Sequence, residues 1–223
     1  MQTARLERMT AITGLFVVAL SLINLTLPPL PASDEPARAY AAYYAAHRTA
    51  LLAVAYLVVL GSAVVVAFLA GLRDLLRRHE GGESTMATTG LVAGVVQFTA
   101  VAAGVSILAA AAYRSGQAAG TITALTDTGW VVINLGAGLP TTVSVAAFSV
   151  VIRRTRLLSR WVAGFGILVA AAHMVVSGAF ARAGFLSAEG AIGVAVPTLY
   201  YLWVLVVSLG LLRRRAVTAA AST

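Results

Sequence analysis

The sequence contains no cysteine. Without thiols the chain has no disulfide, no thiolate nucleophile and no thiolate metal ligand, which excludes quinone-linked thiol oxidoreductases and iron–sulfur proteins. Lysine is missing as well, so all sixteen basic residues are arginine. Arginine in place of lysine, beside abundant alanine and valine, indicates a GC-rich coding bias and a high-GC bacterial host.

Charged residues are scarce, at 11% of 223, whereas 60% are hydrophobic and the mean hydropathy is +0.90. That composition is too apolar for a soluble domain. A helix of about 20 apolar residues crosses a hydrocarbon core. Six runs of this kind carry no charged side chain: residues 9–27, 51–72, 87–112, 129–152, 161–181 and 191–212. The sequence therefore predicts an all-α polytopic bundle of six transmembrane helices, forming a single domain over residues 1–223.

The arginines are distributed unequally between alternate loops. Twelve lie in the two tails and in the loops after the second and fourth runs: Arg5, Arg8, Arg73, Arg77, Arg78, Arg153, Arg154, Arg156, Arg160, Arg213, Arg214 and Arg215. The remaining loops hold four: Arg38, Arg48, Arg114 and Arg182. The positive-inside rule then places both termini in the cytoplasm and the chain in the bacterial plasma membrane. Topology accounts for the net charge of +8, so no nucleic-acid partner is needed.

The first run has a second interpretation, as a cleaved signal peptide. Arg5, the apolar run and the small residues near Ser33 are typical of one. Glu7 and the prolines at 28, 29 and 31 argue against it. The later spans keep their orientation under either interpretation.

Local signals predict where several helices begin and end. Ser33 can cap a helix that begins at Asp34, whose segment 37–49 places Tyr40, Tyr44 and His47 on one face at the membrane interface. Gly81 and Gly82 can supply the left-handed residue that ends the second helix. Ser84 or Thr85 is expected to cap the third.

Few polar side chains lie within the apolar runs, and in lipid they are expected to face other helices or a wet cavity. They are Asn24, Gln97, Asn134, His173, Tyr200 and Tyr201, and most fall in the outer half of the bilayer. Pro140 and Pro197 each free a helix carbonyl nearby. An outward-facing cavity lined by Asn134, His173, Tyr200 and Tyr201 is one interpretation, and purely structural kinks are the other.

A stripe of small residues marks the third run. Gly90, Gly94 and Gly104 share a face with Gln97 and allow a close helix approach. The partner helix can belong to the same chain, to a second copy or to another membrane protein. The Gly90 and Gly94 face is therefore the predicted contact of a homo-oligomer or a membrane partner.

Three residues are candidates for proton transfer. His47 and Asp127 lie near the outer surface and could form a base with a carboxylate partner. His173 is deep in a span, with Ser177 one turn further on as a hydrogen-bond partner. The three histidines lack ligand spacing, so no metal is expected, and no sequence motif calls for a cofactor.

Several local motifs carry a resemblance that covers nearly the whole chain. They are Tyr43-Tyr44-Ala45-Ala46-His47-Arg48, Gly71-Leu72-Arg73-Asp74-Leu75-Leu76-Arg77-Arg78, Gly138-Leu139-Pro140-Thr141 and Arg156-Leu157-Leu158-Ser159-Arg160-Trp161. In these motifs the chain resembles actinobacterial six-helix membrane proteins akin to the DUF4386 group. The resemblance implies six helices and brings no activity or functional residues with it.

Three functions are compatible with these features. The first is a membrane protein that binds or carries a small apolar molecule or lipid. The second is a membrane-embedded enzyme acting on an apolar or prenylated substrate, because the chain is similar in size and helical content to integral-membrane terpene cyclases. It differs from them in having no acid within a span and only 8% aromatic residues. The third is a non-catalytic subunit or scaffold.

Overall fold

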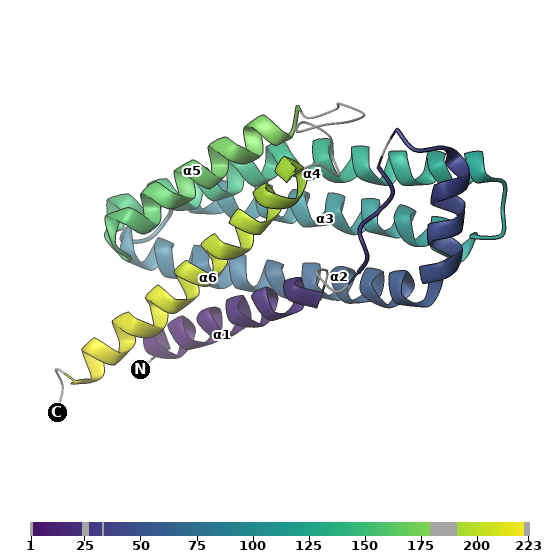
Figure 1. Ribbon diagram of the computed structural model, residues 1–223. Coiled ribbons are helices and arrows are strands. Elements are labelled where there is room, and N and C mark those ends of the chain that lie inside the picture. The colour runs from purple at the N-terminus through teal and green to yellow at the C-terminus, as the bar shows by residue number, and fades with distance from the viewer. Residues whose placement is uncertain (1, 24–26, 33, 179–190, 221–223) are drawn as a thin grey trace.

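The computed structural model describes residues 2–23, 27–32, 34–178 and 191–220. Within these ranges the regular structure is entirely helical, which confirms the all-α prediction. The helices are α1 (Gln2–Ile23), α2 (Ala37–His79), α3 (Thr85–Tyr113), α4 (Ala119–Thr155), α5 (Arg160–Val176) and α6 (Ala191–Ala220), as Figure 1 shows.

Five of the helices are long and apolar enough to cross a membrane, and they are α1, α2, α3, α4 and α6. The fifth helix, α5, has 17 residues. Its rise of about 26 Å falls short of a hydrocarbon core of about 30 Å. The fifth span was predicted to reach residue 181, but α5 ends at Val176, and Ser177 and Gly178 form a turn. Residues 179–181 lie outside the described part of the chain.

Two helices begin much earlier than the predicted spans. α2 starts at Ala37 and α4 at Ala119, so Asp127 lies within a helix and not in a loop. The expected start at Asp34 is wrong, because Pro36 is extended and forms the N-cap. Ser33 lies outside the described residues. The predicted Ser84 cap and the glycine end of α2 are confirmed, since the Ser84 side chain accepts a hydrogen bond from Ala87 N and Gly81 and Gly82 have positive φ. Tyr40 and Tyr44 were expected at the membrane interface, but both are buried in the bundle.

The helices form one elongated bundle in which α3 packs between α2 and α4. α5 packs on α4, and α1 and α6 pack on each other, with α1 also on α2 and α6 also on α5. The first turns of α2 cross the far end of the bundle, where Tyr40 and Tyr44 pack against Ala111, Ala112 and Ile122 (Figure 1). We call this far end the distal end.

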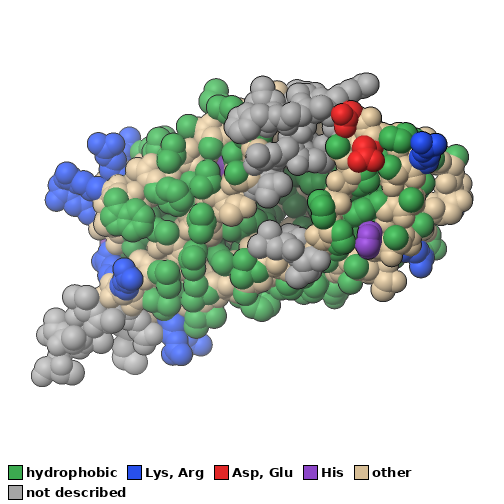
Figure 2. All heavy atoms as spheres, viewed as in Figure 1, with side chains coloured by type: hydrophobic (Ala, Val, Ile, Leu, Met, Phe, Trp, Pro, Cys, Tyr) green, Lys and Arg blue, Asp and Glu red, His purple; other side chains and the backbone are tan. Residues whose placement is uncertain are grey.

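Both termini lie at the opposite end of the bundle (Figure 1). Arginines from the start of α1, the ends of α2, α4 and α6 and the start of α5 belong to this end, and Figure 2 shows basic side chains gathered there. Hydrophobic side chains cover much of the rest of the same face (Figure 2). We call this end the arginine end.

The backbones of α3 and α4 come close together at two glycines. A methyl group at Gly104 would lie 2.7 Å from the Gly129 carbonyl oxygen, and one at Gly129 would lie 3.0 Å from the Gly104 carbonyl oxygen. Ser144 on α4 donates a hydrogen bond of 2.8 Å to the Gly90 carbonyl on α3. Small residues and interhelical hydrogen bonds of this kind hold helices together in lipid.

The glycine face of α3 is used within the chain. Gly90 lies against the Phe148 ring of α4, and Gly94 lies against Leu69 of α2 and Ser144 of α4. Both glycines are buried. The predicted oligomer or partner contact through this face is therefore wrong, because helices of the same chain already occupy it.

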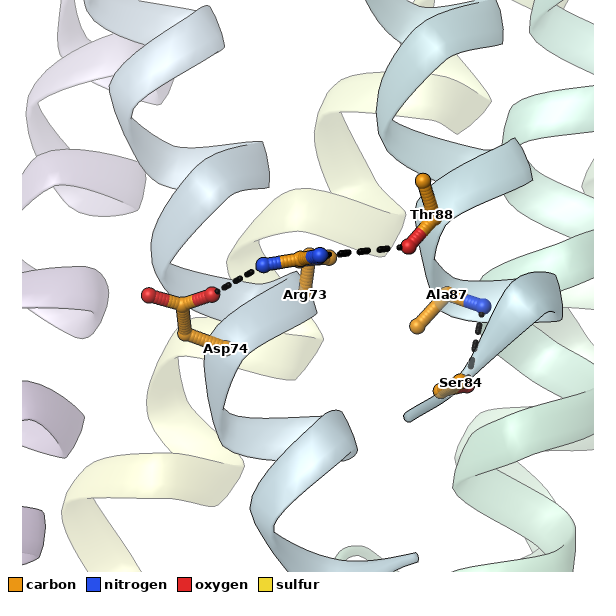
Figure 3. Close-up of polar contacts among 5 residues, drawn as sticks. All are labelled: Arg73, Asp74, Ser84, Ala87 and Thr88. Carbon is orange, nitrogen blue, oxygen red and sulfur yellow. Dashed lines mark hydrogen bonds and ion pairs between the residues drawn. The ribbon is translucent and has the colours of Figure 1, made fainter. Parts of the chain in front are cut away.

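The hairpin between α2 and α3 is closed by polar contacts at the arginine end (Figure 3). The Arg73 guanidinium donates to Asp74 Oδ1 at 2.8 Å and to the Thr88 hydroxyl of α3 at 3.3 Å. Ser84 Oγ accepts from Ala87 N at 3.1 Å at the start of α3. Arg73 thus has partners on both helices and serves to close the turn.

A second arginine connects four parts of the chain at this end. Arg214 of α6 donates to the Leu157 carbonyl at 2.9 Å and contacts His79 Nε2 of α2 at 3.0 Å. Its Nε lies 3.7 Å from Glu7 Oε1 of α1. The His79 Nδ1 faces the Leu75 carbonyl at 2.8 Å, so the proton is on Nδ1 and Nε2 accepts from Arg214. Arg214 therefore has a structural role.

We expect Gly104→Ala to lower the free energy of unfolding by about 1–3 kcal/mol, because its methyl group would force the α3 and α4 backbones apart. Thermal unfolding of the purified chain measures the change. Gly164→Ala is the matched control, since nothing lies within 4 Å of its added methyl group. Equal effects of the two substitutions would show that the α3–α4 approach is not critical.

Candidate ligand site

Tyr200 is the centre of a cluster of rings inside the bundle. Its ring centroid lies 5.8 Å from Phe98 of α3, 6.3 Å from His173 of α5 and 6.0 Å from Trp203 of α6. The Tyr201 ring is 5.6 Å away, and Phe148 of α4 stacks on Trp203 at 6.5 Å. We call these six residues the aromatic cluster. Helices α3, α4, α5 and α6 all contribute to it.

The cluster brings together three of the four predicted ligand-binding residues. His173 and Tyr200 are buried, and Tyr201 is half-buried against Tyr200. The fourth, Asn134, is half-buried on α4, four residues before Gly138, whose backbone packs against Ser177 of α5. No hydrogen bond within the described chain joins Asn134 to the aromatic cluster. Helix packing, and not spacing along the chain, decided this grouping.

The surroundings of the His173 imidazole show which of its two nitrogens carries the proton. Nδ1 lies 3.0 Å from the Val169 carbonyl oxygen, which can only accept, so Nδ1 carries the proton. In the neutral ring Nε2 is then an acceptor. Ser177 was expected to bond the imidazole, but its hydroxyl donates to the His173 carbonyl at 2.7 Å. The imidazole is therefore held by its own helix.

Four buried polar atoms in or beside the cluster lack a hydrogen-bond partner among the described residues. They are Gln97 Oε1, Ser149 Oγ, Tyr200 OH and Trp203 Nε1. The Gln97 side chain reaches the Tyr200 hydroxyl without forming a hydrogen bond of good geometry. Ser149 Oγ and Trp203 Nε1 both border Gly166, where a methyl group would clash with them. An unpaired polar group is costly in an apolar interior, so this concentration calls for an explanation.

Three of these four groups were not named as site residues from the sequence. Gln97 was expected only to join helices, and Ser149 and Trp203 were not singled out. A serine in a membrane span is a weak signal because its hydroxyl usually bonds its own helix, as Ser208 does with the Val204 carbonyl at 2.8 Å. A tryptophan usually marks the interface. Their shared position emerges only when α4, α5 and α6 pack.

The proposed proton-transfer pair is not assembled. His47 lies against the Tyr43 ring at 4.9 Å, and Asp127 is exposed on α4 at the distal end. No ion pair joins them, although the structure describes both residues. Their neighbours do meet, because the hydroxyls of Tyr44 and Thr126 are hydrogen-bonded at 3.1 Å. That contact fixes the start of α2 on α4, while His47 stays half-buried and Asp127 exposed.

Two cavities in the described part of the chain lie at the arginine end. One of about 560 Å³ is beside the α2–α3 hairpin and includes Arg73, Arg77 and Thr88. The other, of about 860 Å³, lies between α5 and α6. No group of three or more acidic or histidine side chains in the described ranges could hold a metal ion. The aromatic cluster itself is closed in this structure, with Tyr200 only 2% exposed.

Comparisons with protein families, with curated proteins and with solved structures find no match for this chain.

We expect Tyr200→Phe to raise the free energy of unfolding by about 1 kcal/mol, because it removes a buried hydroxyl that has no partner. Tyr44→Phe is the control, since it removes a hydroxyl that bonds Thr126 and should cost about 1 kcal/mol. Thermal melts of the two variants in one detergent, after bound small molecules have been removed, compare them. Destabilisation by both would show that the Tyr200 hydroxyl is satisfied in the folded protein.

Proposed function

We propose that this chain is a membrane protein that binds, and carries within the bilayer, a small and largely apolar molecule with one hydrogen-bonding group. The observation that carries the proposal is the concentration of four unpaired buried polar atoms in or beside a ring-lined cluster shared by four helices. Proteins tolerate such atoms where a ligand or a water molecule supplies the missing hydrogen-bond partner. The aromatic cluster, with Gln97 and Ser149, is the proposed site.

The donors and acceptors in the cluster define the class of ligand. Gln97 Oε1 accepts, Trp203 Nε1 donates, and the hydroxyls of Ser149 and Tyr200 can do either. Aromatic rings supply flat apolar walls. No described acidic or arginine side chain belongs to the cluster. These features favour a neutral molecule, such as a lipid alcohol or ketone, over an ion.

Access is proposed at the end of α5, which stops short of the distal end (Figure 1). His173 lies in the last turn of α5, which ends at Val176, so the cluster is close to where this helix stops. On the facing helix Pro197 lies one turn before Tyr200 and Tyr201. A proline weakens the helix around it and makes it easier to bend. A short helix facing a weakened one is a natural place for a ligand to enter.

Two findings disfavour the other functions. An enzyme using His47 and Asp127 as a pair would need them to meet, and they form no ion pair although the structure describes both. His173, the third candidate for proton transfer, lies in the aromatic cluster, where its Nδ1 faces the Val169 carbonyl of its own helix. A scaffold using the glycine face of α3 would need that face to be free, and α2 and α4 cover it. Binding is the function for which three of the four residues predicted from the sequence, His173, Tyr200 and Tyr201, lie together.

The proposed location is a bacterial plasma membrane, crossed six times with both termini in the cytoplasm. Both termini and most of the described arginines share one end, as positive-inside topology requires. The proposal counts α5 as one of the six crossings. The same plan follows from the resemblance to DUF4386-like proteins, and membership of that group is part of the proposal.

Native mass spectrometry of the gently purified chain tests for the ligand. We expect a co-purifying neutral molecule whose retention falls roughly 10- to 100-fold in Gln97→Leu/Tyr200→Phe, because two hydrogen bonds of about 1 kcal/mol or more are lost. Tyr56→Phe is the control, since Tyr56 is 69% exposed on the outside of α2. Retention unchanged in the double variant, or lost equally in the control, would refute the site.

Single cysteines test the topology against a background free of thiols. An impermeant maleimide should label Gln117→Cys at the distal end in intact cells, because this exposed residue lies in the α3–α4 turn. Arg154→Cys, exposed at the end of α4, should react only after the membrane is permeabilised. Labelling of Arg154→Cys in intact cells would reverse the proposed orientation.

A further inference from the structure

The larger cavity at the arginine end differs in chemistry from the aromatic cluster. It has a volume of about 860 Å³ and lies between the start of α5 and residues 206–214 of α6. Four arginines line it, namely Arg156, Arg160, Arg213 and Arg214, and no acidic residue does. A cavity with several guanidinium groups and no carboxylate attracts an anion.

One of the four arginines is already committed to the fold. Arg214 holds the Leu157 carbonyl, His79 and Glu7, so it forms one wall of the cavity. The other three are exposed. Within the described chain the ion pairs involve only Arg73 and Arg214. Arg156, Arg160 and Arg213 therefore bring positive charge to the cavity without a carboxylate to neutralise it.

Arg156 has a backbone conformation that does not favour arginine. It is the residue after α4, with φ 53° and ψ 28°, and no other non-glycine residue in the described chain has a positive φ. Glycine or asparagine takes this left-handed conformation at lower cost. The turn buries Leu157 and Leu158 and leaves the Arg156 side chain at the cavity. An arginine kept at a strained position is consistent with a role for its guanidinium.

The rest of the lining is apolar and continues along the outside of the bundle. Trp161 at the start of α5 is 62% exposed, and Leu209 on α6 is 40% exposed. Val206 lies one turn further from the arginine end. An exposed tryptophan at a helix end is typical of the membrane interface. A dissolved anion would gain nothing from this apolar wall, whereas an acyl chain would pack against it.

We propose that this cavity binds an anionic phospholipid, with the phosphate at Arg156, Arg160 and Arg213 and an acyl chain along Trp161, Val206 and Leu209. Basic pockets between transmembrane helices at one membrane surface suit such headgroups. The site is separate from the aromatic cluster, so this proposal does not depend on the ligand proposed there. It would attach the short helix α5 to α6 through a lipid.

The test compares three probes on the full chain in detergent, which are phosphatidylglycerol, phosphatidylcholine and inorganic phosphate. We expect phosphatidylglycerol to raise the midpoint of thermal unfolding and to bind roughly tenfold more tightly than phosphatidylcholine, whose choline is repelled by the arginines. Inorganic phosphate at the same concentration should have little effect. An equal shift with phosphate would overturn the lipid proposal. It would show that the cavity binds the anion alone and that the apolar wall contributes nothing to binding.

Matched charge removals separate a specific site from general attraction to basic residues. Arg156→Gln/Arg160→Gln should abolish the effect of phosphatidylglycerol. Arg153→Gln/Arg154→Gln removes the same charge at the end of α4, from exposed residues that do not line the cavity, and should preserve the effect. Equal losses in the two variants would overturn the proposal.

Arg156→Gly keeps the test valid if the double variant folds poorly. Glycine suits the left-handed backbone, so the lipid-free midpoint should be unchanged or higher. Phosphatidylglycerol binding, counted by native mass spectrometry, should weaken roughly tenfold because one charge-assisted contact is lost. Wild-type binding by this variant would overturn the role of Arg156.

Discussion

The close approach of α3 and α4 is the constraint on which the rest of the structure depends. Lipid is as apolar as a leucine side chain, so helices gain little from hiding apolar surface from it and must be held by close packing and hydrogen bonds. Here the backbones nearly touch at Gly104 and Gly129, and Ser144 bonds the Gly90 carbonyl nearer the arginine end. This contact fixes where Gln97 and Phe98 of α3 and Phe148 and Ser149 of α4 lie, and α5 and α6 add the remaining residues of the cluster around them.

The same packing leaves several buried polar groups inside the bundle without hydrogen-bond partners in the described chain. Tight contacts satisfy the polar groups at Ser144 and Thr142, whose hydroxyls bond carbonyls on neighbouring helices. They leave Gln97, Ser149, Tyr200 and Trp203 with buried atoms that have no partner in the described chain. A purely structural core would gain stability from apolar residues at these places. Stability given up in one small region is a familiar feature of binding sites, where the ligand supplies the missing contacts.

The two ends of the bundle are held together by different side chains. At the distal end tyrosines pack the first turns of α2 across the bundle, and the Tyr44 and Thr126 hydroxyls bond there. At the arginine end Arg73 and Arg214 hold helices together while other arginines remain exposed. Arginine serves both roles because its guanidinium has five donors and a permanent charge, so it can bond carbonyls within the protein or phosphates outside it.

Composition and charge alone identified a helical membrane protein, because apolar runs of about 20 residues without charges are typical of membrane-spanning helices. They also determined the end of the molecule at which the arginines gather, the Ser84 cap and the glycine end of α2, since these depend on neighbours in the chain. Only tertiary structure decided which helix covers the glycines of α3, because a small-residue stripe does not specify its partner. Tertiary structure also left His47 and Asp127 without an ion pair and brought Gln97, Ser149 and Trp203 into or beside one cluster. Rotation of each helix about its axis sets those contacts, and that rotation follows from packing among all six helices.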